Sequence, residues 1–167
     1  MLQAKPRTVR TPETMQAASH HLLYEWWMLR ETATWLASNV SRTPAEQNAE
    51  LESFCLHVRN LLDFFYPELR GRQARWGDVV AQDFLPAGDW QTGKPPVAEA
   101  LAKVGIRVDK QLAHLTYARL RATEAHSQWD FLQITAALSE VVQVFVHLAE
   151  PSLLSPEWGQ LLGQSKL

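Results

Sequence analysis

The stretch LESFCLHVRNLLDFFY, residues Leu51–Tyr66, decides the fold. Its apolar residues recur at three- and four-residue spacing, which places one set on a single face of an α-helix: Leu51, Phe54, Cys55, Val58, Leu62 and Phe65. Leu56 and Phe64 lie on the opposite face, so the pattern predicts a central helix with neighbours on two sides. Four polar residues lie among the apolar ones: His57, Arg59, Asn60 and Asp63. Since a buried polar group without a partner costs roughly 1–3 kcal/mol, the stretch predicts either a hydrogen-bonded network or a binding site.

Capping residues mark the ends of the other predicted helices. Thr11, followed by Pro12, predicts a helix from there to about residue 37. Thr43 and Glu46 form a capping-box pattern that opens the helix of the central stretch, which ends at Tyr66-Pro67. Further helices are predicted over residues 97–121, with a kink or break at Gly105, and 129–150, and short ones over 76–85 and 155–163; residues 86–96, rich in Pro and Gly, are predicted to be irregular.

The sequence contains no sustained period-two alternation, so strands are not expected. The predicted fold is all-α: an antiparallel four-helix bundle with one or two short accessory helices. The predicted organisation is a flexible N-terminal tail over residues 1–10, a helical bundle domain over 11–150, and a C-terminal extension with a short helical turn over 151–167.

Composition indicates a soluble protein. The chain has 167 residues, a net charge of −2 and a single cysteine, Cys55, which falls on the apolar stripe and is predicted to be a core residue. The apolar run Leu22–Leu29 contains Glu25 and is too short to span a bilayer, and the first residues have no apolar leader segment. We therefore expect a cytoplasmic protein without membrane, metal or cofactor.

A cationic stripe marks the predicted helix 97–121. At about 100° per residue, one side of this helix carries several basic or polar residues: Arg107, Lys110, His114, Tyr117 and Arg121. One interpretation is a solvated basic face that attracts the acidic C-terminal part of the chain. The other is an anion site in which His114 is a general base, Arg107 and Lys110 hold a phosphate, and Tyr117 contributes to binding.

Arg59-Asn60, and Arg107 with His114 after six intervening residues, resemble the signature of HEPN domains. The resemblance implies a small all-α bundle, often a homodimer, that cleaves RNA without a metal. The histidine would help the ribose 2′-OH attack its own phosphodiester and the arginine would stabilise the developing charge. Phe64 stands where the first motif has histidine, and Val108 replaces the polar neighbour of the second. The resemblance thus implies a ribonuclease, or an inactive relative acting through RNA or protein binding.

Two other functions fit the sequence. One is a non-enzymatic interaction module that forms homo-oligomers through apolar surface around Trp90 or the tail Trp158–Leu162. The other is a small-ligand bundle with a pocket lined by Trp26, Trp27 and Phe64. On the central helix, a structural hydrogen bond or ion pair is the alternative to a catalytic role for the pairs His57/Asn60 and Arg59/Asp63.

Overall fold

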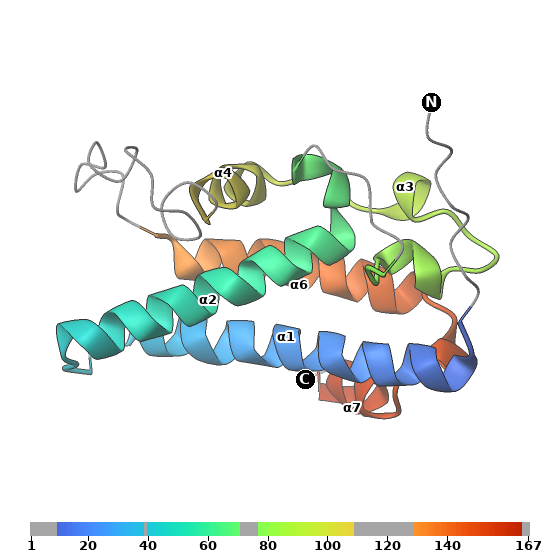
Figure 1. Ribbon diagram of the computed structural model, residues 1–167, viewed down its shortest axis with the longest axis horizontal. Helices are drawn as coiled ribbons and strands as arrows, with labels where there is room; N and C mark the ends of the chain where they lie inside the picture. Colours follow the sequence, from blue (N-terminus) through green and yellow to red (C-terminus); the bar gives the residue numbers. More distant parts are fainter. Residues whose placement is uncertain (1–9, 39, 71–76, 109–128, 165–167) are drawn as a thin grey trace.

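The computed structural model describes residues 10–38, 40–70, 77–108 and 129–164, and these residues contain helices and no strand. The long helices are α1 (Pro12–Ala37), α2 (Pro44–Phe65) and α6 (Phe131–Leu148), and α4 (Glu99–Arg107) and α7 (Glu157–Gln164) are shorter. Single turns lie between them: η1 (Pro67–Arg70), η2 (Ala81–Phe84), α3 (Trp90–Gly93) and η5 (Pro151–Leu153). The predicted all-α class is confirmed. In Figure 1, α1 and α2 run in opposite directions beside each other, and α6 packs on α1. The rings of Phe131 and Phe145 of α6 contact phenylalanine rings of α2.

The predicted caps form as expected. Thr11 Oγ1 accepts a hydrogen bond from the backbone N–H of Thr14 at 3.3 Å. At the start of α2, Thr43 Oγ1 accepts from Glu46 N at 3.3 Å, and Glu46 Oε2 accepts from Thr43 N at 2.8 Å. These bonds pair backbone donors that have no partner inside the helix, so each helix begins where its sequence predicts.

Three local predictions need correction. Residues 77–80 are not helical and only the turn η2 forms, because Asp83 Oδ2 accepts from Val80 N at 3.0 Å and holds a tight turn there. Within the stretch expected to be irregular, Asp89 Oδ1 accepts from Gln91 N at 3.0 Å and starts the one-turn helix α3. α4 continues through Gly105 to Arg107, so the described part of this helix is unbroken at the glycine. Residues 109–121 of the predicted helix, like residues 1–9 of the predicted tail, lie outside the described residues.

The core is a cluster of aromatic rings around Phe145 of α6. The rings of Phe64, Phe65 and Phe84 lie 5.2, 5.5 and 5.6 Å from it, at steep interplanar angles. Trp90 lies 6.0 Å from the same ring. Edge-to-face contacts of this kind each add roughly 0.5–1.5 kcal/mol beyond the burial of apolar area. Residues far apart in the sequence therefore share one core.

The C-terminal helix α7 is tied to α1 through Ser19. Ser19 Oγ accepts from the backbone N–H of Ser155 at 2.6 Å, and Ser19 O accepts from Trp158 Nε1 at 3.0 Å. Trp158 is 1% exposed. The extension after Pro151 is thus packed on the outer side of α1 (Figure 1).

Helix α6 is the one described helix that is long and apolar enough to cross a bilayer by length and composition. In the fold, its apolar residues Leu138, Val142 and Phe145 are buried in the core. Its exposed positions include Gln133, Glu140 and Gln143. Leu132 and Leu148 of this helix are exposed as well, and a third of the helix is buried inside the fold.

Candidate functional site

A carboxylate that lies between two helices organises the polar residues of α2. Glu25 of α1 accepts two hydrogen bonds on the same oxygen, Oε2: one from His57 Nδ1 at 2.6 Å and one from Asn60 Nδ2 at 3.0 Å. Because a carboxylate only accepts, the His57 ring must carry its proton on Nδ1. The predicted pair His57 and Asn60 therefore comes together on a partner that we did not predict for it. We call these three residues the Glu25 cluster.

The electrostatics of the Glu25 cluster favour an ionised carboxylate. Burial by itself would raise the pKa of Glu25, but the hydrogen bonds from His57 and Asn60 and the nearby charges of His57 and His21 outweigh it, and the pKa lies below its ordinary value. A lowered carboxyl pKa means that the folded state binds the charged form more favourably than the unfolded chain does. The cluster thus stabilises the contact between α1 and α2.

Access to His57 is small. The side chain is buried at 5% exposure, and the ring of Tyr24 lies edge-on to it with the centroids 5.9 Å apart. A general base must come within hydrogen-bonding distance of the proton that it removes. A histidine covered by a tyrosine and bound to a carboxylate is better suited to hold two helices together, which is the structural interpretation of the polar stretch.

The remaining binding candidates of α2, Arg59 and Asp63, are half-buried. Asp63 and Asn60 line a small cavity of about 190 Å³ together with Phe64. A pair between Arg59 and Asp63 stays a prediction.

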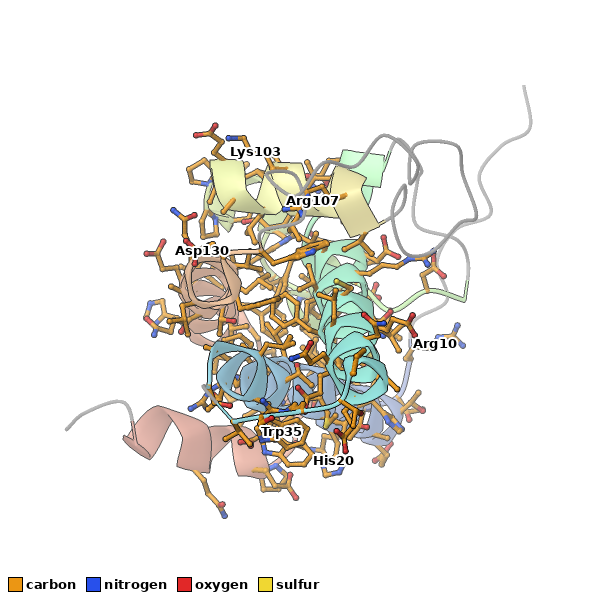
Figure 2. The ribbon with its side chains drawn as sticks, turned by 90° about the vertical axis from the view of Figure 1, so that its left-hand side faces the viewer. Arg10, His20, Trp35, Lys103, Arg107 and Asp130 are labelled. Carbon is orange, nitrogen blue, oxygen red and sulfur yellow. The ribbon has the colours of Figure 1, made fainter. Side chains whose placement is uncertain are left out.

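Arg107, the described member of the predicted catalytic set, lies elsewhere. Its guanidinium carbon lies 4.0 Å from the centre of the Trp129 ring, and burial lowers the pKa of Arg107 while the nearby Cys55 opposes that shift. Arg107 lies near Cys55, and positions 55 and 57 of a helix point about 200° apart. Arg107 and His57 therefore lie on opposite sides of α2. Figure 2 shows Arg107 on the α4 side of the molecule, far from His20 and Trp35 at the opposite edge. Lys110, His114 and Tyr117 lie outside the described residues.

A reactive cysteine and a metal centre are two further kinds of site. Burial raises the pKa of the Cys55 thiol to about 12, so this cysteine is a thiol at neutral pH and packs as the predicted core residue. Within the part of the chain that the structure describes, no three His, Cys, Asp or Glu side chains gather in a group that could hold a metal ion.

No family model, curated protein or solved structure matches this chain.

An exposed aromatic surface lies beside the Glu25 cluster. Tyr24 and Trp27 of α1 are 49% and 52% exposed, and their rings lie 6.1 Å apart. Leu56 of α2 is 52% exposed, and Trp35 continues the same side of α1 two turns further on. We call Tyr24, Trp27, Trp35 and Leu56 the aromatic face.

Burial corrects the sequence predictions for Trp90, for Trp158 and for the ligand pocket. Trp90 and Trp158 are each 1% exposed, so neither indole is available to a partner. The expected ligand pocket does not form either, because Trp26 and Phe64 are buried in the core while Trp27 faces solvent. The sequence signal for the exposure of Trp27 was the tandem Trp26-Trp27, since adjacent residues of a helix lie about 100° apart and cannot both enter one core.

Proposed function

We propose that this chain is a helical interaction protein that self-associates through the aromatic face of α1 and α2. The observation that carries the proposal is the exposure of the neighbouring rings of Tyr24 and Trp27 on α1, with Leu56 exposed on the adjacent helix α2. Contiguous exposed apolar surface, rich in tyrosine and tryptophan, is typical of binding surfaces.

The proposed occupant of the aromatic face is a second copy of the chain. α1 has 26 residues and α2 has 22, so side by side the two helices span about 35 by 20 Å, and α7 covers part of that area on α1. A stable dimer buries about 800 Å² on each partner, so the interface needs most of the exposed part of this face. A two-fold dimer also requires that the same patch be used on both subunits, which a single extended face satisfies.

The Glu25 cluster supports the interface from beneath. Tyr24 packs on His57, whose Nδ1 is fixed by Glu25, so the aromatic side chains rest on an ordered base. A surface held in its binding conformation loses less conformational entropy on association. We therefore assign His57 and Asn60 to positioning the interface.

The four-helix arrangement is part of the same proposal. The described helices contact one another in a closed ring: α1 with α2, α2 with α4, α4 with α6 and α6 with α1. This ring of contacts supports an antiparallel bundle in which α7 packs on part of α1, while the aromatic face stays exposed.

Light scattering of purified protein tests the proposal. We expect the wild-type chain to have the mass of a dimer at micromolar concentration, and Trp27→Glu to have the mass of a monomer, because a charge placed in a desolvated interface is strongly unfavourable. Leu132→Glu is the matched control: Leu132 is 63% exposed on α6 and is not part of the aromatic face, so this variant should stay dimeric. A monomeric wild-type chain, or equal masses for wild type and Trp27→Glu, would rule the interface out.

RNA cleavage is the second candidate function. The observation that favours it is that Trp129 fixes Arg107, the arginine of the second HEPN-like motif, close in sequence to Lys110 and His114. The net charge of −2 provides no general attraction for RNA, so this function needs a local cationic site.

A single substitution tests the RNA candidate. We expect His114→Ala to abolish cleavage of labelled single-stranded RNA in the presence of a metal chelator, while His147→Ala, an exposed histidine of α6, leaves it unchanged. RNA left intact by the wild-type chain, or equal cleavage by wild type and His114→Ala, contradicts this candidate and leaves the self-association proposal standing.

A further inference from the structure

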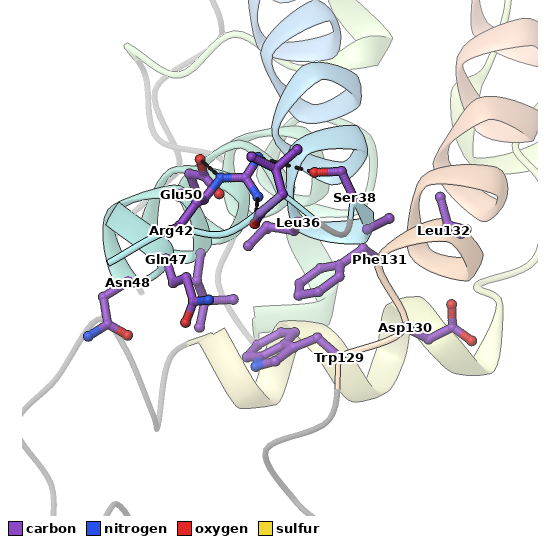
Figure 3. A pocket seen from close by; sticks show the side chains of 13 residues that line it. Leu36, Ser38, Arg42, Gln47, Asn48, Glu50, Trp129, Asp130, Phe131 and Leu132 are labelled. Atoms are coloured by element: carbon purple, nitrogen blue, oxygen red, sulfur yellow. Dashed lines mark hydrogen bonds and ion pairs between the residues drawn. The ribbon is translucent and has the colours of Figure 1, made fainter. Parts of the chain in front are cut away.

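A groove of about 920 Å³ lies between the end of α1, the start of α2 and the start of α6 (Figure 3). Cavities that bind small molecules in proteins measure about 300–1,000 Å³. The rim of this groove is apolar: Val40 and Leu132 line it and are each 63% exposed, more than any other large hydrophobic side chain among the described residues. A bound molecule that covers these two side chains removes apolar surface from water, which favours binding.

Two aromatic rings form part of the inner wall of the groove. The half-buried apolar residues that line it are Leu36, Leu51, Trp129 and Phe131. Phe131 packs edge-on against the core residue Phe54, with 5.1 Å between the ring centres. The guanidinium carbon of Arg107 lies 4.0 Å from the centre of the Trp129 ring, and Arg107 does not itself line the groove. Both rings are thus held by contacts outside the groove, which leaves a preformed surface for a flat ring.

The charged side chains around the groove balance one another. Arg42 Nε donates to Glu50 Oε1 at 2.6 Å, so these two lining residues form an ion pair. Asp130 caps α6, where its Oδ1 accepts from Gln133 N at 2.9 Å and the helix dipole is positive. With Arg107 included, two arginines stand against two carboxylates. The described residues therefore give the groove no net charge that would offset the dehydration of an ionic ligand.

Uncharged amides form the polar side of the groove. Gln47 and Asn48 of α2 line it, and both side chains are exposed. Figure 3 shows Gln47 on the opposite side of the groove from Phe131 and Trp129. A side-chain amide both donates and accepts hydrogen bonds without carrying a charge. This side of the groove is therefore suited to a hydroxyl or carboxamide group attached to a ring.

We propose that the groove binds an uncharged aromatic compound that carries a hydroxyl or carboxamide group. The ring lies against Trp129 and Phe131 and covers Val40 and Leu132, while the polar group bonds to Gln47. Burial of the ring supplies affinity. The balanced charges select the neutral compound over an amine or an acid of the same shape, because either ion would lose hydration without gaining a net attraction. The site shares no residue with the aromatic face, so ligand binding does not require self-association.

Isothermal titration with three ligands of one shape tests the proposal. The probes are 2-naphthalenemethanol, 2-naphthylmethylamine and 2-naphthoate, which share a ring and are neutral, cationic and anionic at neutral pH. We expect the alcohol to bind saturably, and about fivefold or more tightly than either ion at low ionic strength. An ion that binds as tightly as the alcohol, or no saturable binding of the alcohol, would overturn the proposal.

Two pairs of variants locate the binding. Leu132→Ala removes apolar surface from the rim and Gln47→Ala removes the hydrogen-bonding amide, so each should weaken binding of the alcohol about threefold. The controls are Leu148→Ala and Gln143→Ala, which change exposed residues of α6 that do not line the groove and should leave the affinity unchanged. All four positions are exposed, so the variants should fold like the wild-type chain. If Leu132→Ala and Gln47→Ala bind the alcohol as the wild-type chain does, or if the controls weaken it equally, the groove is not the site.

Discussion

Replacing Glu25 by alanine should destabilise the fold by about 3 kcal/mol, a large effect for one residue that is not part of the apolar core. The variant leaves His57 Nδ1 and Asn60 Nδ2 without the oxygen that both now contact. His57 is 5% exposed, so water cannot easily replace the lost acceptor. Urea-induced unfolding followed by circular dichroism measures the difference in unfolding free energy. A dimer makes this value depend on concentration, so all variants must be compared at one protein concentration.

Three comparisons separate the role of the cluster from that of a surface charge. Glu52→Ala, on an exposed position of α2, should change the unfolding free energy by less than about 0.5 kcal/mol. Glu25→Gln keeps an amide oxygen and should lose less stability than Glu25→Ala.

The pKa of Glu25 is lower in the folded protein than in the unfolded chain. The contribution of Glu25 to the unfolding free energy is therefore complete above the ordinary pKa of 4.5 and is lost as the pH falls through the pKa of the folded state. Glu25→Gln should lack this part of the acid dependence. If Glu25→Ala behaves like Glu52→Ala, the cluster does not hold the helices together.

Trp90→Ala should cost about 4 kcal/mol, because it removes one of the two fully buried tryptophan side chains from the aromatic core. The indole contacts Phe65 and Phe145 at 5.8 and 6.0 Å, and its Nε1 donates to Phe65 O at 2.7 Å. Chemical denaturation measures this effect in the same way.

Two variants accompany that measurement. Trp90→Phe retains most of the ring but leaves Phe65 O without its donor, so the loss should be smaller, about 1–3 kcal/mol. Leu132→Ala, on an exposed side chain, should be nearly neutral. A Trp90→Ala variant that remains stable but fails to form the dimer would instead place Trp90 at an interface.

Local sequence signals predicted helix ends better than they predicted the environment of each side chain. Thr11 and Thr43 identify helix starts because a cap depends on residues three positions away. Trp90 was predicted to lie in an irregular loop because Pro and Gly surround it, yet its indole enters a core formed by α2 and α6. Burial of this kind is decided by contacts between segments that are distant in the sequence. The spacing of residues within one segment does not predict those contacts.

The candidate site shows the same difference between what the local sequence predicts and what contacts between helices decide. The polar residues His57 and Asn60 were correctly expected to be enclosed with partners, since they interrupt an apolar helix. Their acceptor, Glu25, was visible as a carboxylate inside the apolar run Leu22–Leu29, and only the antiparallel pairing of α1 with α2 brings it to His57. The pairing register of two helices depends on how their side chains interdigitate, which one sequence does not specify.

Hydroxyl-radical footprinting of dilute and concentrated protein tests the self-association face most directly. Oxidation is measured by mass spectrometry for each exposed side chain under conditions where light scattering gives the monomer and the dimer. We expect Tyr24, Trp27 and Leu56 to become protected in the dimer, while Val79 and Leu132, which are equally open to solvent in one chain, keep their oxidation rates. Unchanged oxidation of Tyr24 and Trp27 in a proven dimer, with protection elsewhere, would contradict an interface on α1 and α2.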